Sequence, residues 1–255
     1  MTDLCFEENA EQECESYVDS ALKITDTDGE PLVDALQTAT SLRLSQSRKE
    51  EAMKYILRVY DKMKTGCEAL AKLVGLEDET SKRAVELEEV DAADSLPSFE
   101  FRCQTAKLLL ECAAKDDGEE GNVVSNSNSN NQQKSNPASS EKEQEKQRCN
   151  RAAIQVLASL LAENDEVPEC WYLLGCAFKA TSNNESASYY WTRALEMLTE
   201  IQKNLEKELE EMGDTMEEDE NENDELETEL QSISCQMEEI RSKLEEIEDT
   251  EEMEE

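Results

Sequence analysis

The sequence predicts an all-α protein, a solenoid of stacked antiparallel helical hairpins. Three observations lead to this prediction. A set of anchor residues in the C-terminal third has the spacing of a helical hairpin repeat, and part of that set recurs 34 residues earlier. The composition agrees, because seven Gly, four Pro and 5 % aromatic residues among 255 suit a helical solenoid with a thin core better than a sheet protein.

The anchors have the spacing of a tetratricopeptide (TPR) repeat, in which two short helices pack face to face. Gly175 and Ala187 are small, so we expect the two helices to touch there while larger side chains fill the space around the contact. A polar turn at 181–184 separates the helices and supplies a helix-starting residue ahead of Glu185. The predicted repeat-packing residues are Trp171, Leu174, Gly175, Phe178, Ala187, Trp191 and Ala194.

The echo of this pattern predicts a second hairpin. Ala153 lies 34 residues before Ala187, and Leu157 and Leu160 lie 34 residues before Trp191 and Ala194. We therefore predict that a helix over 140–164 pairs with a helix over 99–114. In the first of these, Ser140 and Glu143 have the spacing of a capping box.

Apolar periodicity predicts four helices nearer the N-terminus, over residues 9–25, 32–45, 49–64 and 66–76. The second and third form a hairpin with offsets close to the TPR template, although Arg43 stands where an aromatic residue is usual. The facing positions are Leu36, Ala39 and Thr40 on one helix, and Ala52, Ile56 and Val59 on the other.

Residues 116–138 include a run of serine, asparagine and glutamine that cannot bury enough apolar area to offset the entropy lost on ordering. We predict a disordered insertion in a helix–helix turn, where a solenoid tolerates it. The whole chain is predicted to comprise a TPR-like helical repeat domain at 1–212, which contains this insertion, and an acidic tail at 213–255.

The helix that begins near Glu185 keeps its apolar period up to a stop at Gly213. Residues 201–255 then hold 24 acidic and four basic side chains, a net charge of −20. Steps of four and three residues make a heptad seam of Leu226, Leu230, Ile233, Met237, Ile240, Leu244 and Ile247. This seam can pair with a second copy or fold back as a helix that caps the solenoid. We favour the cap, or a mobile acidic helix, and with either a monomer, because the flanking charges are only partly complementary.

The net charge of −38 disfavours nucleic acid and anionic membranes as direct partners and favours a basic protein, although acidity can also serve solubility alone. The chain has no histidine, which removes Ser-His and Cys-His nucleophiles and the common zinc sites. Nine cysteines without a C-x-x-C pair indicate reduced thiols in the cytosol or nucleus. We therefore predict neither an enzyme nor a site for a metal or cofactor.

A TPR solenoid presents positions 2, 5, 9 and 12 of each first helix on its concave face. An acidic residue falls at position 2 in all three predicted hairpins, so the groove would select lysine- or arginine-bearing segments. Lys179 and Leu110 take position 12 in the last two. The other predicted groove residues are Asp34, Gln37 and Ser41; Glu100, Cys103 and Lys107; and Glu169, Tyr172 and Cys176.

Five segments carry a resemblance to a known family. They are Met1–Leu4 with Glu7–Cys14, Leu36–Gln46, Arg102 with Leu108–Glu111, Val156–Asp165, and Trp171–Gly175. Together they resemble the dedicated assembly chaperones of large-subunit ribosomal protein four, a TPR family. The resemblance covers roughly residues 1–200 and is most specific in the last two segments.

This resemblance implies a non-catalytic solenoid that captures one newly made ribosomal protein, shields its basic extended regions and accompanies it from the cytoplasm toward assembly in the nucleus. Family members begin with further repeats before the segment resembling Met1–Leu4, so we expect either a truncated gene model or a shortened form. The insertion and the heptad-bearing tail also depart from the family pattern. Two alternatives are a general TPR adaptor for short linear motifs and an acidic histone-type chaperone.

Overall fold

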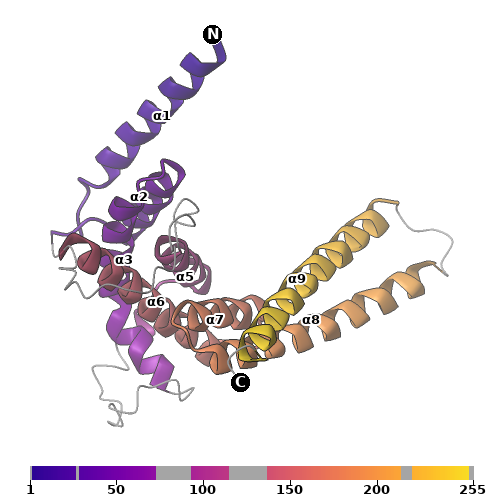
Figure 1. Cartoon of the computed structure of the whole chain (residues 1–255). Coiled ribbons are helices and arrows are strands. Elements are labelled where there is room, and N and C mark those ends of the chain that lie inside the picture. The colour runs from indigo at the N-terminus through magenta and orange to yellow at the C-terminus, as the bar shows by residue number, and fades with distance from the viewer. Residues whose placement is uncertain (1, 27–28, 73–92, 115–136, 214–219, 253–255) are drawn as a thin grey trace, which may run out of the picture. The chain divides into compact units, whose positions relative to one another are not determined.

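The computed structural model describes residues 2–26, 29–72, 93–114, 137–213 and 220–252, and every named element in these ranges is an α-helix (Figure 1). The all-α prediction is therefore confirmed, while the TPR type of the repeat stays a prediction. The helices are α1 (Thr2–Ala21), α2 (Val33–Ser45), α3 (Lys49–Ala71), α5 (Phe99–Ala113), α6 (Pro137–Glu163), α7 (Pro168–Ala180), α8 (Asn184–Gly213) and α9 (Glu220–Glu252).

The helices pack into two compact units, residues 1–159 and 160–255. The first unit contains α1, α2, α3, α5 and most of α6, and the second contains α7, α8 and α9. The division into a repeat domain at 1–212 and a tail at 213–255 stays a prediction drawn from composition.

Positions that the repeat pattern assigns to helix–helix contacts are buried in each hairpin. The pattern assigns three such positions to the second helix of each hairpin, and all nine of these side chains are at most 2 % exposed. In α2, Leu36, Ala39 and Thr40 are fully buried, and the Thr40 hydroxyl donates to the Leu36 carbonyl at 2.8 Å. The nine residues are Ala52, Ile56 and Val59 in α3, Ala153, Leu157 and Leu160 in α6, and Ala187, Trp191 and Ala194 in α8.

Arg43, the departure from the aromatic position in α2, is buried and ion-paired. Its Nη1 donates to Glu15 Oε1 of α1 at 2.8 Å, and its Nε lies 3.5 Å from Glu51 Oε2 of α3. Gln46 and Arg48 also donate to the same Glu15 oxygen. A charged contact thus joins α1 to the α2–α3 hairpin where an aromatic ring would otherwise fill the space.

The first helix differs from its prediction at both ends. Helix α1 spans Thr2–Ala21 rather than residues 9–25. It ends earlier because the chain turns after Ala21 toward an isolated bridge between Thr25 and Pro31.

Boundaries of α3 and α6 differ as well. Helix α3 continues through Gly66 to Ala71, so the separate helix predicted from residue 66 is wrong. Met63, Cys67 and Ala71 extend its buried stripe, and this packing offsets the low helix propensity of glycine. Residues 73–76 of that prediction lie outside the described residues.

Helix α6 begins at Pro137, three residues before the predicted start. Proline suits a first helical position, because its fixed φ is helical and the N–H that it lacks would have no partner there. Ser140 is therefore inside the helix, and the predicted capping box is wrong. The last two residues of the insertion predicted at 116–138 are helical for the same reason, and the rest of it lies outside the described residues.

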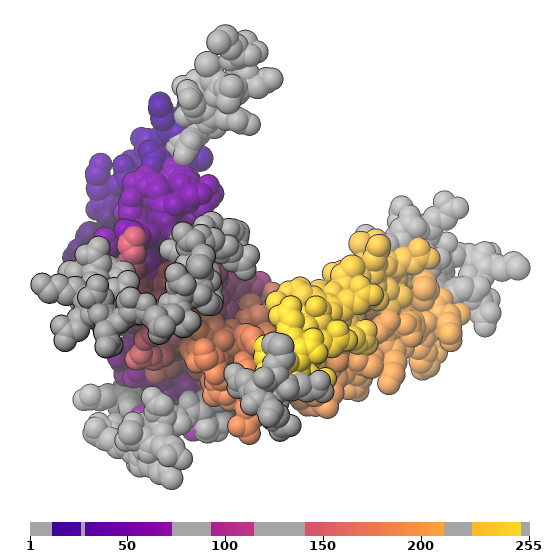
Figure 2. Space-filling view, viewed as in Figure 1, coloured from indigo at the N-terminus to yellow at the C-terminus, as the bar shows by residue number. Residues whose placement is uncertain are grey.

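Helix α8 runs to Gly213, as predicted, and α9 packs beside it in antiparallel orientation (Figure 1). In Figure 2 the coloured surfaces of the two helices lie against each other. Four residues of the heptad seam, Ile233, Met237, Ile240 and Ile247, are at most 6 % exposed in this contact. The seam therefore packs within the chain, as the fold-back alternative predicts.

Candidate partner-binding face

The contact between α7 and α8 depends on Gly175. A Cβ added there would lie 2.2 Å from Cδ1 of Trp191, so the α7 backbone rests directly on the indole ring. The Trp191 Nε1 donates to the backbone carbonyl of Tyr172 at 3.1 Å, which fixes the orientation of the ring. This geometry matches the sequence prediction that a small residue marks the helix–helix contact.

Tyr190 completes the aromatic packing around this contact, and the sequence analysis missed it. Its ring stacks on Phe178 with centroids 5.2 Å apart and lies 5.7 Å from the ring of Trp171. Burial raises the pKa of the Tyr190 hydroxyl to about 12. Tyr190 lies three residues after Ala187, and this helical spacing would have placed it on the α7-facing side.

The turn between α7 and α8 has the expected capping chemistry. The Asn183 side-chain oxygen accepts from the Ser186 backbone N–H at 3.0 Å, which satisfies one unpaired donor at the start of α8. Ser182 takes a positive φ of 61° before it. The Trp171 Nε1 donates to the Asp165 carbonyl at 2.8 Å, so the chain entering α7 is held as well.

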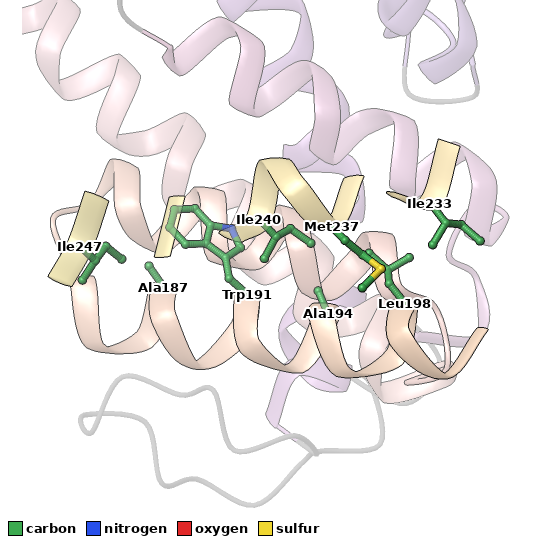
Figure 3. Close-up of a cluster of buried hydrophobic side chains, with 8 residues drawn as sticks. All are labelled: Ala187, Trp191, Ala194, Leu198, Ile233, Met237, Ile240 and Ile247. Carbon is green, nitrogen blue, oxygen red and sulfur yellow. The ribbon is translucent and has the colours of Figure 1, made fainter. Parts of the chain in front are cut away.

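Helix α9 covers the exposed side of this hairpin. Figure 3 shows its aliphatic side chains pointing down onto α8, with Ile247 near Ala187, Ile240 beside Trp191, and Ile233 near Leu198. Trp171, Tyr172 and Cys176 of α7 pack against the same cluster and are half-buried. The second unit is therefore a three-helix packing with Trp191 at its centre.

Two of the predicted groove residues, Tyr172 and Cys176, lie at the contact with α9. The Tyr172 hydroxyl donates to the Glu239 carboxylate at 2.5 Å. Burial, and then this hydrogen bond to a carboxylate, raise the pKa of Tyr172 above its usual range. Burial also raises the pKa of the Cys176 thiol, which is therefore uncharged at neutral pH.

Lys243 of α9 completes the face that we define by Tyr172, Cys176 and Trp191, called here the α7–α8 face. Its Nζ lies 5.9 Å from the centroid of the Trp191 ring and 3.5 Å from Glu239 Oε1. The proximity of Lys243 is one of the influences that lower the Cys176 pKa against the effect of burial. A lysine thus occupies a position above an aromatic ring, a geometry that attracts cations.

The remaining residue of this set on α7, Glu169, is exposed in the first turn of the helix. A carboxylate there is favourable because the N-terminus of a helix carries a partial positive charge. Cys176 and Tyr172 follow it at helical spacing on α7. The predicted groove residues of the last hairpin therefore consist of one exposed carboxylate and two side chains that contact α9.

The six predicted groove residues of the first unit lie on α2 and α5. Gln37 joins these helices, because its Nε2 donates to the Phe101 carbonyl at 3.0 Å and to Thr105 Oγ1 at 2.8 Å. Asp34, Ser41 and Glu100 are exposed, Lys107 is half-buried and Cys103 is buried. The structure thus leaves a partner access to the three exposed side chains, while Gln37 and Cys103 contribute to packing.

Asp34 also borders an apolar cavity of about 360 Å³ between α1 and α2. Tyr17, Ile24 and Leu32 line it and are themselves exposed. The apolar surface at this place lies next to the first of the predicted acidic groove positions.

The described side chains contain no group of three or more histidine, cysteine or carboxylate residues arranged to hold a metal ion. Burial raises the pKa of Cys112 and Cys149 to about 12, so these two thiols are not nucleophilic at neutral pH. Within the described ranges, no helix has the length and apolar character that a membrane span requires.

The chain is similar to a curated protein of stated role. It is 28 % identical over 190 residues to a protein of Schizosaccharomyces pombe (strain 972) named a probable assembly chaperone of rpl4. The match covers 74 % of this chain and 38 % of the relative, so the chain spans well under half of that protein's length. No family model matches the chain.

Proposed function

We propose that this protein is a non-catalytic chaperone of TPR type that captures a newly made basic ribosomal protein, large-subunit ribosomal protein four (rpl4), and protects it during ribosome assembly. The similarity to a protein named a probable assembly chaperone of rpl4 carries this proposal. The partner is held one to one by a monomer, without turnover.

Charge supports the same proposal. The chain carries a net charge of −38, and it needs no bound ion to attract a basic partner at long range. Exposed carboxylates at Asp34, Glu100 and Glu169 lie on the first helices of three hairpins, where a lysine- or arginine-rich segment can reach them. An acidic surface also competes with RNA for such segments. The complex would form in the cytoplasm and travel to the nucleus, with no direct contact to nucleic acid or membrane.

Calorimetric titration with purified rpl4 at low and moderate salt tests the proposal, with a second basic ribosomal protein of similar charge as the control. We expect one-to-one binding that survives moderate salt and excludes the control protein. Equal binding to both proteins, lost together as salt rises, would contradict a dedicated chaperone. It would leave only non-specific attraction between opposite charges, the property that also defines the histone-type alternative.

Matched charge reversals test the predicted partner-binding residues. Glu169→Lys and Glu200→Lys both raise the net charge by two, and both positions are exposed. If α7 presents the partner-binding carboxylate, Glu169→Lys weakens binding of rpl4 by at least tenfold more than Glu200→Lys. Equal losses would show that only the total charge matters, and the predicted position of the site would then be wrong.

A further inference from the structure

The basic residues of α9 are confined to the part of the helix that packs near the α7–α8 face. Of the 33 residues between Glu220 and Glu252, only Arg241 and Lys243 are basic. Both lie in the part of the helix that covers α7 and α8, between the buried residues Ile240 and Ile247. An otherwise acidic helix thus carries its two cations in the segment that packs on α7 and α8, and one of them, Lys243, lies over Trp191.

The contacts of Lys243 resemble those of a bound ligand. The ammonium group lies over the Trp191 ring, and its side chain is 31 % exposed. Glu239, one turn earlier, accepts from the Tyr172 hydroxyl and lies within ion-pair distance of Lys243. The α7–α8 face therefore accommodates a lysine on a helix, with the Trp191 ring supplied by the face and the Glu239 carboxylate supplied by the same helix as the lysine.

We propose that residues 233–250 of α9 are a built-in competitor, which fills the α7–α8 face until a lysine-bearing segment of the basic partner replaces them. This inference rests on the proposed function and deepens it, because it names the chemistry that the partner must supply. A partner lysine would take the place of Lys243 over Trp191. The released α9 would still attract the basic partner through its carboxylates.

Competition within the chain has a measurable consequence. When a binding surface is exposed for only a fraction of the time, the apparent affinity falls by that fraction. A change that weakens the docking of α9 without altering the α7–α8 face should therefore tighten partner binding. If α9 never left the α7–α8 face, weakening its docking would not tighten partner binding.

Two pairs of isosteric or size-matched variants separate docking from net charge. Glu239→Gln removes the carboxylate that holds Tyr172, and Glu238→Gln removes the same charge from an exposed neighbour. Lys243→Gln removes the ammonium over Trp191, and Arg241→Gln removes a cation from an exposed position. Circular dichroism and a melting curve check that each variant stays folded.

Titration of rpl4 into the four variants gives the first readout. We expect Glu239→Gln and Lys243→Gln each to bind about fivefold more tightly than its own control. These two changes alter net charge in opposite directions, so a purely electrostatic effect would move their affinities in opposite directions. Tightening in both pairs is therefore specific to competition.

Hydrogen exchange of the unmodified chain gives the second readout. An acidic helix that loses its packing is only marginally stable in water, so displacement of α9 should speed amide exchange over residues 233–250 when rpl4 is added. Faster exchange with tightening in both pairs supports the inference. Binding of rpl4 with unchanged or slower exchange there, or affinities equal to the controls, would overturn it and leave the proposed function standing. Absence of rpl4 binding by the unmodified chain would overturn both.

Discussion

A single absent methyl group determines how closely α7 approaches α8. Gly175 lies against the Trp191 ring, and its missing Cβ leaves room that an alanine would fill at 2.2 Å from a ring carbon. The contact atoms belong to a ring that is buried and hydrogen-bonded to the Tyr172 carbonyl, so the ring cannot easily swing aside. Either the ring or the α7 backbone must move to accept a side chain.

Gly175→Ala should therefore destabilise the protein by about 1–3 kcal/mol, the usual result of overpacking a core. The sign of the change in stability distinguishes a crowded site from an uncrowded one, because replacing glycine by alanine inside an uncrowded helix stabilises it by up to about 1 kcal/mol. Urea denaturation followed by tryptophan fluorescence measures the free energy of unfolding.

The variant Trp191→Leu, in which a smaller side chain without a ring replaces the indole, supplies the control for this prediction. In that background Gly175→Ala should lose most of its effect, because the clashing atoms are gone. An equal destabilisation in both backgrounds would show that the indole is not the reason for the glycine, and a gain in stability would contradict the close contact altogether.

At this scale the sequence predicts small and apolar positions well and polar contacts poorly. Spacing alone identifies Gly175, Ala187 and Trp191, because the geometry of a helical hairpin demands small and large residues at fixed intervals. The Tyr172–Glu239 hydrogen bond joins residues 67 positions apart. No local pattern encodes that pairing, since it depends on which surface α9 covers.

Among the elements, α1 shows how an ionic contact can replace an apolar one. Glu15 receives donors from Arg43, Gln46 and Arg48 of the α2–α3 hairpin. The Gln46 hydrogen bond, then Arg43 and Arg48, lower the pKa of Glu15 below its usual value of 4.5. A carboxyl whose pKa is lowered by folding contributes stability above its unfolded pKa and loses it as pH falls through the folded value.

Glu15→Gln should consequently lower the melting temperature at pH 7, and the difference from the unmodified chain should shrink as pH falls below about 4.5. Taking the difference removes the general effect of neutralising the other carboxylates. Glu13→Gln, at an exposed position on the same helix, is the matched control and should change little. A difference that persists unchanged at pH 3 would mean that the carboxylate charge does not hold α1.

Helix α9 shows the reverse case, in which an acidic element is held by apolar side chains. Ile240 is 1 % exposed beside Trp191, whereas Ser242 is exposed two residues later. Ile240→Ala should lower the free energy of unfolding by about 2–4 kcal/mol, which combines lost burial with the cavity that remains. Ser242→Ala should lie within about 0.5 kcal/mol of the unmodified chain.

Unfolding in urea, followed through tryptophan emission, measures both variants. A shift of the emission to longer wavelength in Ile240→Ala before the main transition would indicate that α9 leaves Trp191 first. Equal stability of the two variants would contradict the docking of α9 on α8.

Element boundaries were harder to predict than element types, for physical reasons. Gly66 suggests a break, yet the buried stripe of α3 continues across it, and tertiary packing outweighs local propensity. Pro137 extends α6 backward because proline is favourable in a first turn. The heptad of α9 predicts that a seam exists, but the period does not say which surface the seam covers.

At the scale of the whole molecule, charge and packing are arranged separately. The seam of α9 faces α8, while its exposed positions carry carboxylates that add to the net charge of −38. Fields from exposed charges extend about 10 Å at 0.1 M salt and about 3 Å at 1 M. Such fields accelerate encounter with an oppositely charged partner more than they strengthen the final complex.

The quadruple variant Glu227→Gln, Glu229→Gln, Glu245→Gln and Glu246→Gln tests this separation, because all four residues are exposed on α9 and none belongs to the seam. We expect its association rate with rpl4 at low salt to fall by roughly threefold to tenfold while the dissociation rate stays nearly constant. Raising the salt to 0.5 M should bring the two association rates together, since screening removes the field that the variant lacks. Stopped-flow kinetics measures the association rates, and dilution or competition measures dissociation.

A dissociation rate that rises as much as the association rate falls would instead place these carboxylates inside the interface. The acidic helix would then be a contact surface for the partner as well as a source of long-range attraction.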